Sequence, residues 1–177
     1  QMEWKKRGID LEWQAYFELG YNPKFKYASS IGKTWSPTLA IPYRQTDGSV
    51  ALVQHRLLNP LDSKKYLPDV YGLKNVPFIC NPDMKQGRNL VVAEGAIKSA
   101  VTFITVNSKE YQVMGAMNKG EMKKVINKYR SVKNMIVIPD PDAAEEIRQV
   151  CQQSGARMLF LPEKVDDYIL GNKITTA

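Results

Sequence analysis

The sequence predicts an α/β fold in which a mainly parallel sheet flanked by helices follows a smaller α+β lobe with a β-hairpin. From residue 90 onward, short apolar runs alternate with helical patterns, which is typical of a parallel sheet covered on both faces. In the first half, two strand-like runs are instead joined by a tight-turn signal. A chain of 177 residues has room for both parts. We therefore expect an amino-terminal basic lobe over residues 1–87 and the α/β domain over residues 88–177.

The composition excludes several classes of protein. Hydrophobic residues make up 44% of the chain and charged residues 24%, as is usual for a globular protein in water. No apolar run approaches the roughly 20 residues that span a bilayer, and no signal-peptide pattern is present. Cys80 and Cys151 are far apart and have no Cys or His partner at metal-ligand spacing, so neither a zinc site nor a disulfide framework is expected. We therefore expect a cytoplasmic protein.

The net charge of +7 is concentrated in the first half. Residues 1–89 carry 13 basic residues against 8 acidic ones, and residues 90–177 carry 12 against 10. A basic excess favours polyanionic partners such as nucleic acid. Solvated surface lysines produce the same balance, so this observation supports a nucleic-acid partner only weakly.

The chain begins with a predicted helix and a segment of uncertain structure. Residues 10–19 form a short amphipathic pattern in which Asp10 is a suitable N-cap and Gly20 a suitable C-cap. Residues 21–38 have no sustained periodicity, and we expect a loop that its aromatic side chains anchor to the domain. The lysines interleaved with these rings leave a second interpretation open, in which the segment follows a nucleic-acid backbone while the rings stack on bases.

A β-hairpin is predicted next. The strand-like runs 39–43 and 49–58 are joined by a turn that contains an Asp-Gly pair. Basic residues lie at the end of the second run and shortly after it: Arg56, Lys64 and Lys65. His55, which is the only histidine, is expected to be packed or solvated rather than catalytic.

The α/β pattern begins with the stretch 90–104. Leu90 to Ala93 is a short apolar run that predicts a buried strand, and the spacing of apolar residues from Ala96 onward predicts a helix. Glu94 therefore stands at the carboxyl end of a strand, where open α/β sheets place their ligand sites. An equally good interpretation is that Glu94 stabilises the amino end of the helix. Further strands are predicted at 111–114, 134–138 and 156–161, and further helices at 119–129, 143–153 and 166–170.

Carboxylates recur at the ends of these predicted strands. Asp140 and Asp142 follow the apolar run 135–138, and Asp166 and Asp167 follow the last strand. Residues i and i+2 of an extended segment point the same way, so the first pair can converge on one ion. An oxygen-only set without His or Cys suits Mg²⁺ or Mn²⁺, whose usual substrates are phosphates. Alternatively, both aspartates of this pair cap the helix that follows.

These motifs resemble those of a known family. Val-Val-Ala-Glu-Gly at 91–95 followed by Val-Ile-Pro-Asp-Pro-Asp at 137–142 resembles the TOPRIM domain of bacterial-type primases, topoisomerases and some nucleases. Lys-Val-Asp-Asp-Tyr-Ile at 164–169 is similar to the segment that closes this domain, with Asp167 as the best-matched acid. The lobe resembles the amino-terminal half of a bacterial or phage primase catalytic core in three segments, at 41–56, 65–67 and 71–73.

The resemblance implies a DNA primase that makes short RNA primers on single-stranded DNA by two-metal nucleotidyl transfer, with ribonucleoside triphosphates as substrates. Asp140 and Asp142 would be the principal ligands of Mg²⁺ or Mn²⁺, Glu94 a ligand or general base, and Asp167 an outer ligand. Arg56, Lys64 and Lys65 would line the groove for template and nucleotide. We also expect the chain to belong to a larger phage or plasmid replication protein that works with a replicative helicase or helicase domain.

Lys98 departs from the family pattern, because many members have an acid at this position. Its ammonium group is expected either to offset the acidic cluster or to contact a nucleotide phosphate. Two other functions stay open. A metal-dependent TOPRIM nuclease would use the same acids with water as the nucleophile. In a non-catalytic nucleic-acid-binding module, these acids would no longer function in catalysis.

Overall fold

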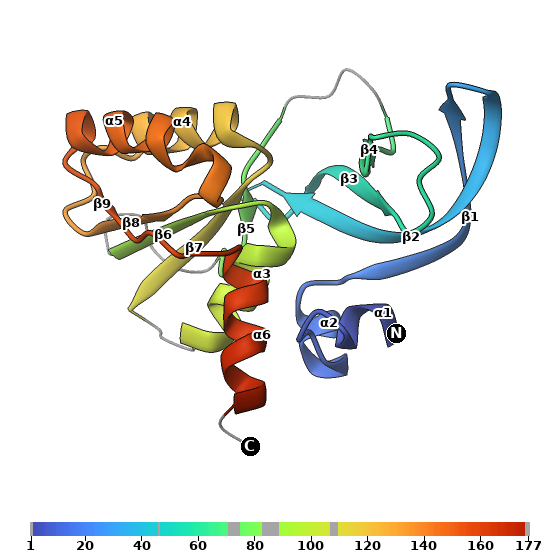
Figure 1. The fold of residues 1–177 in the computed structure, drawn as a ribbon, viewed down its shortest axis with the longest axis horizontal. Coiled ribbons are helices and arrows are strands. Elements are labelled where there is room, and N and C mark those ends of the chain that lie inside the picture. Colours follow the sequence, from blue (N-terminus) through green and yellow to red (C-terminus); the bar gives the residue numbers. More distant parts are fainter. Residues whose placement is uncertain (1, 46, 71–74, 83–88, 107–109, 176–177) are drawn as a thin grey trace. The chain divides into compact units, whose positions relative to one another are not determined.

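The computed structural model describes residues 2–45, 47–70, 75–82, 89–106 and 110–175. The fold is a mixed α/β fold with two sheets (Figure 1). The chain forms two compact units, residues 1–74 and residues 75–177, and each unit contains one of the sheets. The division into a lobe over residues 1–87 and a domain over residues 88–177 stays a prediction.

The first unit contains an antiparallel sheet with the strand order β1-β2-β3-β4. The strands are β1 (Gly20–Ser29), β2 (Gly32–Arg44), β3 (Val50–Leu57) and β4 (Tyr66–Pro68). The pairing of β2 with β3 across the Asp-Gly turn confirms the predicted β-hairpin.

The expected loop at residues 21–38 is wrong, because these residues form most of β1 and the first part of β2. Lysine and aromatic residues alternate from Lys24 to Tyr27, which is the period of a strand. The register between β1 and β2 shifts between Asn22 and Phe25, so the alternation is interrupted and is difficult to recognise in the sequence. On the inner face, Tyr27 packs in a small core with Leu57 and Leu67.

Two short helices precede this sheet, α1 (Met2–Lys5) and α2 (Leu11–Tyr16). The side chain of Asp10 accepts a hydrogen bond from the Trp13 backbone N–H at 3.2 Å, which confirms the predicted N-cap. The prediction of Gly20 as the C-cap is wrong. The helix is capped at Phe17, and Gly20 is already the first residue of β1.

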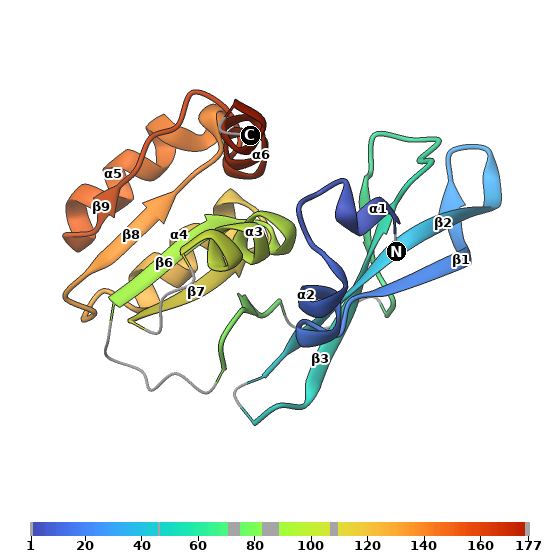
Figure 2. The same ribbon diagram turned by 90° about the horizontal axis from the view of Figure 1, so that it is seen from below.

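The second unit contains a five-stranded sheet with the order β5-β7-β6-β8-β9. Figure 2 shows the strands β7, β6, β8 and β9 side by side in this order. The strands β6 to β9 run parallel to one another, and β5 is antiparallel to β7. The predicted alternation of strands and helices is confirmed in this unit, although the last strand is shorter than predicted and β5 was not predicted. The strand bounds are β5 (Phe78–Ile79), β6 (Asn89–Glu94), β7 (Tyr111–Ala116), β8 (Met135–Ile138) and β9 (Arg157–Met158).

Helices cover both faces of this sheet. Figure 1 shows α4 (Lys119–Lys128) and α5 (Ala144–Ser154) on one face, and α3 (Ala96–Val106) and α6 (Val165–Thr175) on the other. A short 3₁₀ turn, η1 (Pro141–Ala143), leads into α5. In the described part of the chain, no helix is both long enough and apolar enough to cross a membrane.

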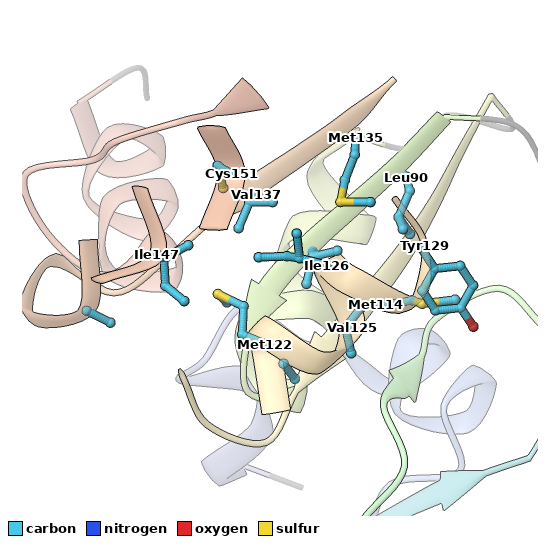
Figure 3. Packing of buried hydrophobic residues seen from close by; sticks show 13 residues of the cluster. Leu90, Met114, Met122, Val125, Ile126, Tyr129, Met135, Val137, Ile147 and Cys151 are labelled. Carbon is cyan, nitrogen blue, oxygen red and sulfur yellow. The ribbon is translucent and has the colours of Figure 1, made fainter. Parts of the chain in front are cut away.

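The core of the second unit lies between the sheet and the helices α4 and α5 (Figure 3). Met122, Ile126 and Ile147 of these helices are completely buried there. Because successive residues of a strand face opposite sides, Leu90 and Val92 point into this core while their neighbours face α3. Burial on both faces explains the continuous apolar run in β6. It also fixes the position of Glu94 at the end of that strand.

Candidate functional site

Glu94 and Asp140 lie at the same edge of the second sheet. Glu94 is the last residue of β6, and Asp140 follows the end of β8, which pairs with β6 in parallel. The backbone N–H of Asp140 donates a hydrogen bond to the Glu94 carboxylate. Parallel neighbours end at the same edge, which brings these residues together although 46 positions separate them in the sequence.

The turn after Glu94 packs closely against β7. Gly95 has a φ of 83°, which favours glycine. Its carbonyl accepts a hydrogen bond from the Ser99 hydroxyl at 2.8 Å and so connects the turn to α3. A Cβ atom added at Gly115 of β7 would lie 2.6 Å from the Ser99 Oγ and 2.9 Å from the Gly95 carbonyl oxygen. The absence of a side chain at Gly115 therefore allows the turn that positions Glu94.

Glu94 lies in an electrostatic environment that favours a cation or a proton. Burial raises the pKa of its carboxyl group, and the charges of Asp140 and Asp142 raise it further, while the Lys98 ammonium lowers it. Its Oε2 atom is buried and has no hydrogen-bond partner among the residues that the structure describes. A buried carboxylate oxygen without a partner is costly, so binding a cation there would be favourable.

Asp140 already has a cationic partner. The Nζ atom of Lys98, on the first turns of α3, lies 2.5 Å from each carboxylate oxygen of Asp140. The two side chains are only 15% and 10% exposed, so this ion pair is largely shielded from water. Lys98 therefore offsets the acidic cluster, which is one of the two roles that the sequence suggested.

Asp142 lies in η1, close enough for its charge to raise the pKa of Glu94. In contrast to Asp140, it is exposed. Among the described residues, neither aspartate side chain accepts a capping hydrogen bond from the backbone N–H groups at the amino ends of η1 and α5. The alternative in which these aspartates cap the following helix is therefore wrong.

In the last acidic pair, Asp166 is buried and Asp167 is exposed. Asp166, in the first turn of α6, is 7% exposed, and its Oδ1 atom is buried without a hydrogen-bond partner. Burial raises the pKa of its carboxyl group, and the nearby Lys98 charge opposes that shift. Asp167 is exposed. Sequence reasoning chose Asp167 by its match to the family pattern, whereas burial of one face of α6 is what distinguishes Asp166.

The cluster fits a divalent cation in its chemistry, although the ligands do not converge around one point. In the described ranges, no three acidic, histidine or cysteine side chains lie close enough together to hold a metal ion. The oxygen donors nevertheless suit Mg²⁺ or Mn²⁺, and the buried Oε2 of Glu94 lacks a partner that such an ion would provide.

The predicted basic residues lie in the first unit. Arg56 of β3 is partly buried, and within the described part of the chain its buried Nε and Nη1 atoms have no hydrogen-bond partner. Its guanidinium carbon lies 5.8 Å from the centre of the Tyr66 ring on β4. Lys64 and Lys65 are exposed immediately before β4. These cations are suitable for binding phosphates, because an unpaired guanidinium binds anions strongly.

A hollow of about 510 Å³ lies beside the strand β1. Its lining includes Lys24, Lys26, Lys33 and Trp35. The Trp35 ring is 59% exposed, and the Lys26 Nζ atom lies 5.3 Å from its centre. The ring of Trp35 therefore does not anchor the strand to the core, and an exposed ring beside lysines is a suitable surface for stacking a base.

His55 is packed, as the sequence suggested. Its ring stacks on Phe25 with 3.9 Å between the ring centres. Its Nδ1 atom lies 2.9 Å from the Thr38 hydroxyl. Burial lowers the pKa of His55, although Asp69 opposes this shift.

Solved structures share the fold of the chain. A primase from Aquifex aeolicus, comprising zinc-binding and RNA polymerase domains, matches with a TM-score of 0.67, 16% identity and coverage of 99% of this chain and 54% of that one. The primase fragment of the bacteriophage T7 primase-helicase matches with a TM-score of 0.67 and 16% identity, over 97% of this chain and 69% of the fragment. A DnaG primase catalytic domain matches with a TM-score of 0.61, 17% identity and coverage of 96% and 69%.

The chain therefore has the fold of bacterial- and phage-type primase catalytic cores. It spans about half the length of the Aquifex structure. No protein-family model matches the sequence, and no curated protein matches it. The segment 71–73, which the sequence comparison with the family included, lies outside the described residues.

Proposed function

We propose that this chain is the catalytic core of a DNA primase, a DNA-directed RNA polymerase that synthesises short RNA primers on single-stranded DNA. The proposal rests on one observation above all. In a chain with the fold of primase cores, Glu94 and Asp140 are hydrogen bonded at the edge of a parallel sheet, and Asp142 lies close enough to act on Glu94. The second unit would be the TOPRIM domain, and the first unit the basic lobe of the core.

The reaction would join the 3′-hydroxyl of a growing primer to the α-phosphate of an incoming ribonucleotide and release pyrophosphate. Mg²⁺ or Mn²⁺, when bound, would lower the hydroxyl pKa and neutralise the phosphates. Asp142 and the unpaired oxygen of Glu94 would hold such an ion, with Asp167 as an outer ligand. The family resemblance implies a second ion on Asp140, which requires Lys98 to leave that carboxylate.

The first unit would bind the nucleic acid. The DnaG domain with the same fold is described as bound to single-stranded DNA, and the T7 fragment belongs to a primase-helicase. By analogy, Arg56, Lys64 and Lys65 would contact template and nucleotide phosphates, and a replicative helicase or helicase domain would be the partner of a larger phage or plasmid protein. The buried, unpaired nitrogens of Arg56 support this role, because an anion would satisfy them.

A non-catalytic nucleic-acid-binding module is the second candidate function. The observation that favours it is the ion pair between Lys98 and Asp140, which neutralises one of the acids that catalysis would use. In a metal-dependent nuclease, the third candidate, the same acids would activate water.

One experiment separates these three functions. The chain is incubated with Mn²⁺, labelled ribonucleoside triphosphates and a single-stranded DNA template, and parallel samples contain labelled DNA without nucleotides. Template-dependent RNA products support the primase. Cleaved DNA without RNA products would identify a nuclease, and neither product despite DNA binding would identify the binding module.

A further inference from the structure

Lys98 lies beside carboxylates that come from three segments of the second unit. Its ammonium group contacts both oxygens of Asp140, and its charge also acts on Glu94 and on the buried Asp166. These acids come from the end of β6, the segment after β8 and the start of α6. The ammonium is therefore the common counter-ion of the acidic cluster.

We propose that Lys98 is a resident cation that takes the place of one divalent metal ion, so that the acidic site binds a single Mg²⁺ or Mn²⁺ ion. This inference rests on the proposed function, because it concerns the metal requirement of the same site. It replaces the expectation of two ions with one ion and one fixed ammonium group.

The burial of the ion pair makes Lys98 difficult to displace. Both side chains are at least 85% buried, as their exposed fractions of 15% and 10% show. If Lys98 moved away from Asp140 while remaining in the protein, two charges would lose their partners in a medium of low dielectric constant. A second metal ion on Asp140 would also lie beside the ammonium group and be repelled by it.

The remaining acids offer carboxylate oxygens to one ion, although among the described residues no three of them converge on a point. Asp142 is exposed, and the Oε2 atom of Glu94 is buried without a partner. Asp166 adds a second buried carboxylate oxygen without a partner, at a residue that is 7% exposed. The site has four carboxylates: Glu94, Asp140, Asp142 and Asp166. With one divalent ion and the Lys98 ammonium group present, the net charge of this group is still negative. With two ions and Lys98 the net charge of this group becomes positive, and including the exposed Asp167 only brings it to zero, so a second ion gains little electrostatic stabilisation.

The number of bound Mn²⁺ ions tests the proposal directly. Free Mn²⁺ is measured by electron paramagnetic resonance while the complete chain is titrated, for the wild type and for Lys98→Asp. We expect one ion per wild-type chain. In Lys98→Asp, the cation is replaced by another carboxylate, and a second ion should bind at least about tenfold more tightly than any second ion in the wild type. The matched control is Lys124→Asp, because Lys124 pairs with Glu121 on the exposed side of α4; it should bind one ion.

The outcomes separate this inference from the proposed function. Two Mn²⁺ ions in the wild type, together with primer synthesis, would overturn the role of Lys98 and leave the primase intact. No bound ion and no RNA product in the wild type would overturn both. The wild-type result does not depend on the folding of any variant. If Lys98→Asp shows a cooperative melting transition but still binds one ion, the inference is also wrong.

Discussion

The Nζ atom of Lys98 lies 2.5 Å from both carboxylate oxygens of Asp140, and this ion pair joins α3 to the segment that follows β8. The sequence singled out both residues, Asp140 as a metal ligand and Lys98 as a cation that offsets the acidic cluster or contacts a nucleotide phosphate. Their pairing means that Asp140 and Asp142, which are two positions apart, have different roles in stability. The buried aspartate balances a buried lysine, and the exposed one does not.

Asp140→Asn should destabilise the metal-free protein by roughly 3 kcal/mol, because it leaves the Lys98 ammonium buried without its counter-ion. Asp142→Asn is the matched control and should change the free energy of unfolding by less than about 0.5 kcal/mol, because Asp142 is exposed. Urea unfolding at neutral pH without metal measures both values. Equal effects of the two substitutions would show that the ion pair does not contribute to stability.

Glu94→Gln should raise the melting temperature at neutral pH when no metal is present. The pKa of Glu94 is raised above 4.5 in the folded protein, so the ionised form of this carboxyl group disfavours folding at neutral pH. Below pH 4.5 the group is protonated in both states, and the gain from glutamine should disappear. Glu121→Gln should have the opposite effect at neutral pH, because the hydrogen bond from Lys124 lowers the pKa of Glu121. Melting curves across this pH range for the three proteins provide the test.

Stability should decrease as the pH falls below 6.5, because of His55. The folded protein holds this histidine with a lowered pKa, whereas in the unfolded chain it takes up a proton near pH 6.5. Protonation therefore favours the unfolded state. His55 is the only histidine, so His55→Gln should remove the slope of the unfolding free energy between about pH 7 and 5.5. A slope that persists in the variant would assign it to other groups.

Periodic apolar patterns predicted the second unit well. The alternation that starts at Leu90 identified β6, β7, β8 and the helices between them, because burial on both faces leaves a continuous apolar signal. The first unit was harder to predict. In β1 a register shift next to Pro23 interrupts the alternation, and the solvent face carries lysines that resemble a loop.

The candidate site was predictable in its residue types but not in its pairings. The sequence placed Glu94 and Asp140 at strand ends, and the topology of a parallel sheet then brings them together. Lys98 pairs with an acid 42 positions away in the sequence. A local sequence pattern could not predict this pairing, because it depends on side-chain contacts in the folded protein. The burial of Asp166 instead of Asp167 likewise depends on how α6 packs against α3.

Lys64→Ala and Lys65→Ala together should weaken the binding of single-stranded DNA for all sequences alike. Each lost phosphate contact should reduce the slope of log affinity against log salt by up to about one unit. Fluorescence anisotropy at several salt concentrations measures this slope. Lys119→Ala with Lys123→Ala is the control, because both lysines already form ion pairs with Glu146. A slope that changes only in the control pair would place the DNA surface on α4.

The assignment of the acidic cluster as the active site is tested most directly by the rate of template-dependent RNA synthesis in folded variants of these acids. Glu94→Gln and Asp142→Asn keep the shape of the side chains and remove a charge, and circular dichroism melting first establishes that both are folded. The rate of RNA synthesis should fall at least about a hundredfold in each variant, because metal binding and charge stabilisation are lost together. The wild type and Lys124→Asp should synthesise RNA at similar rates. Wild-type rates in both acidic-site variants would show that these carboxylates do not form the active site.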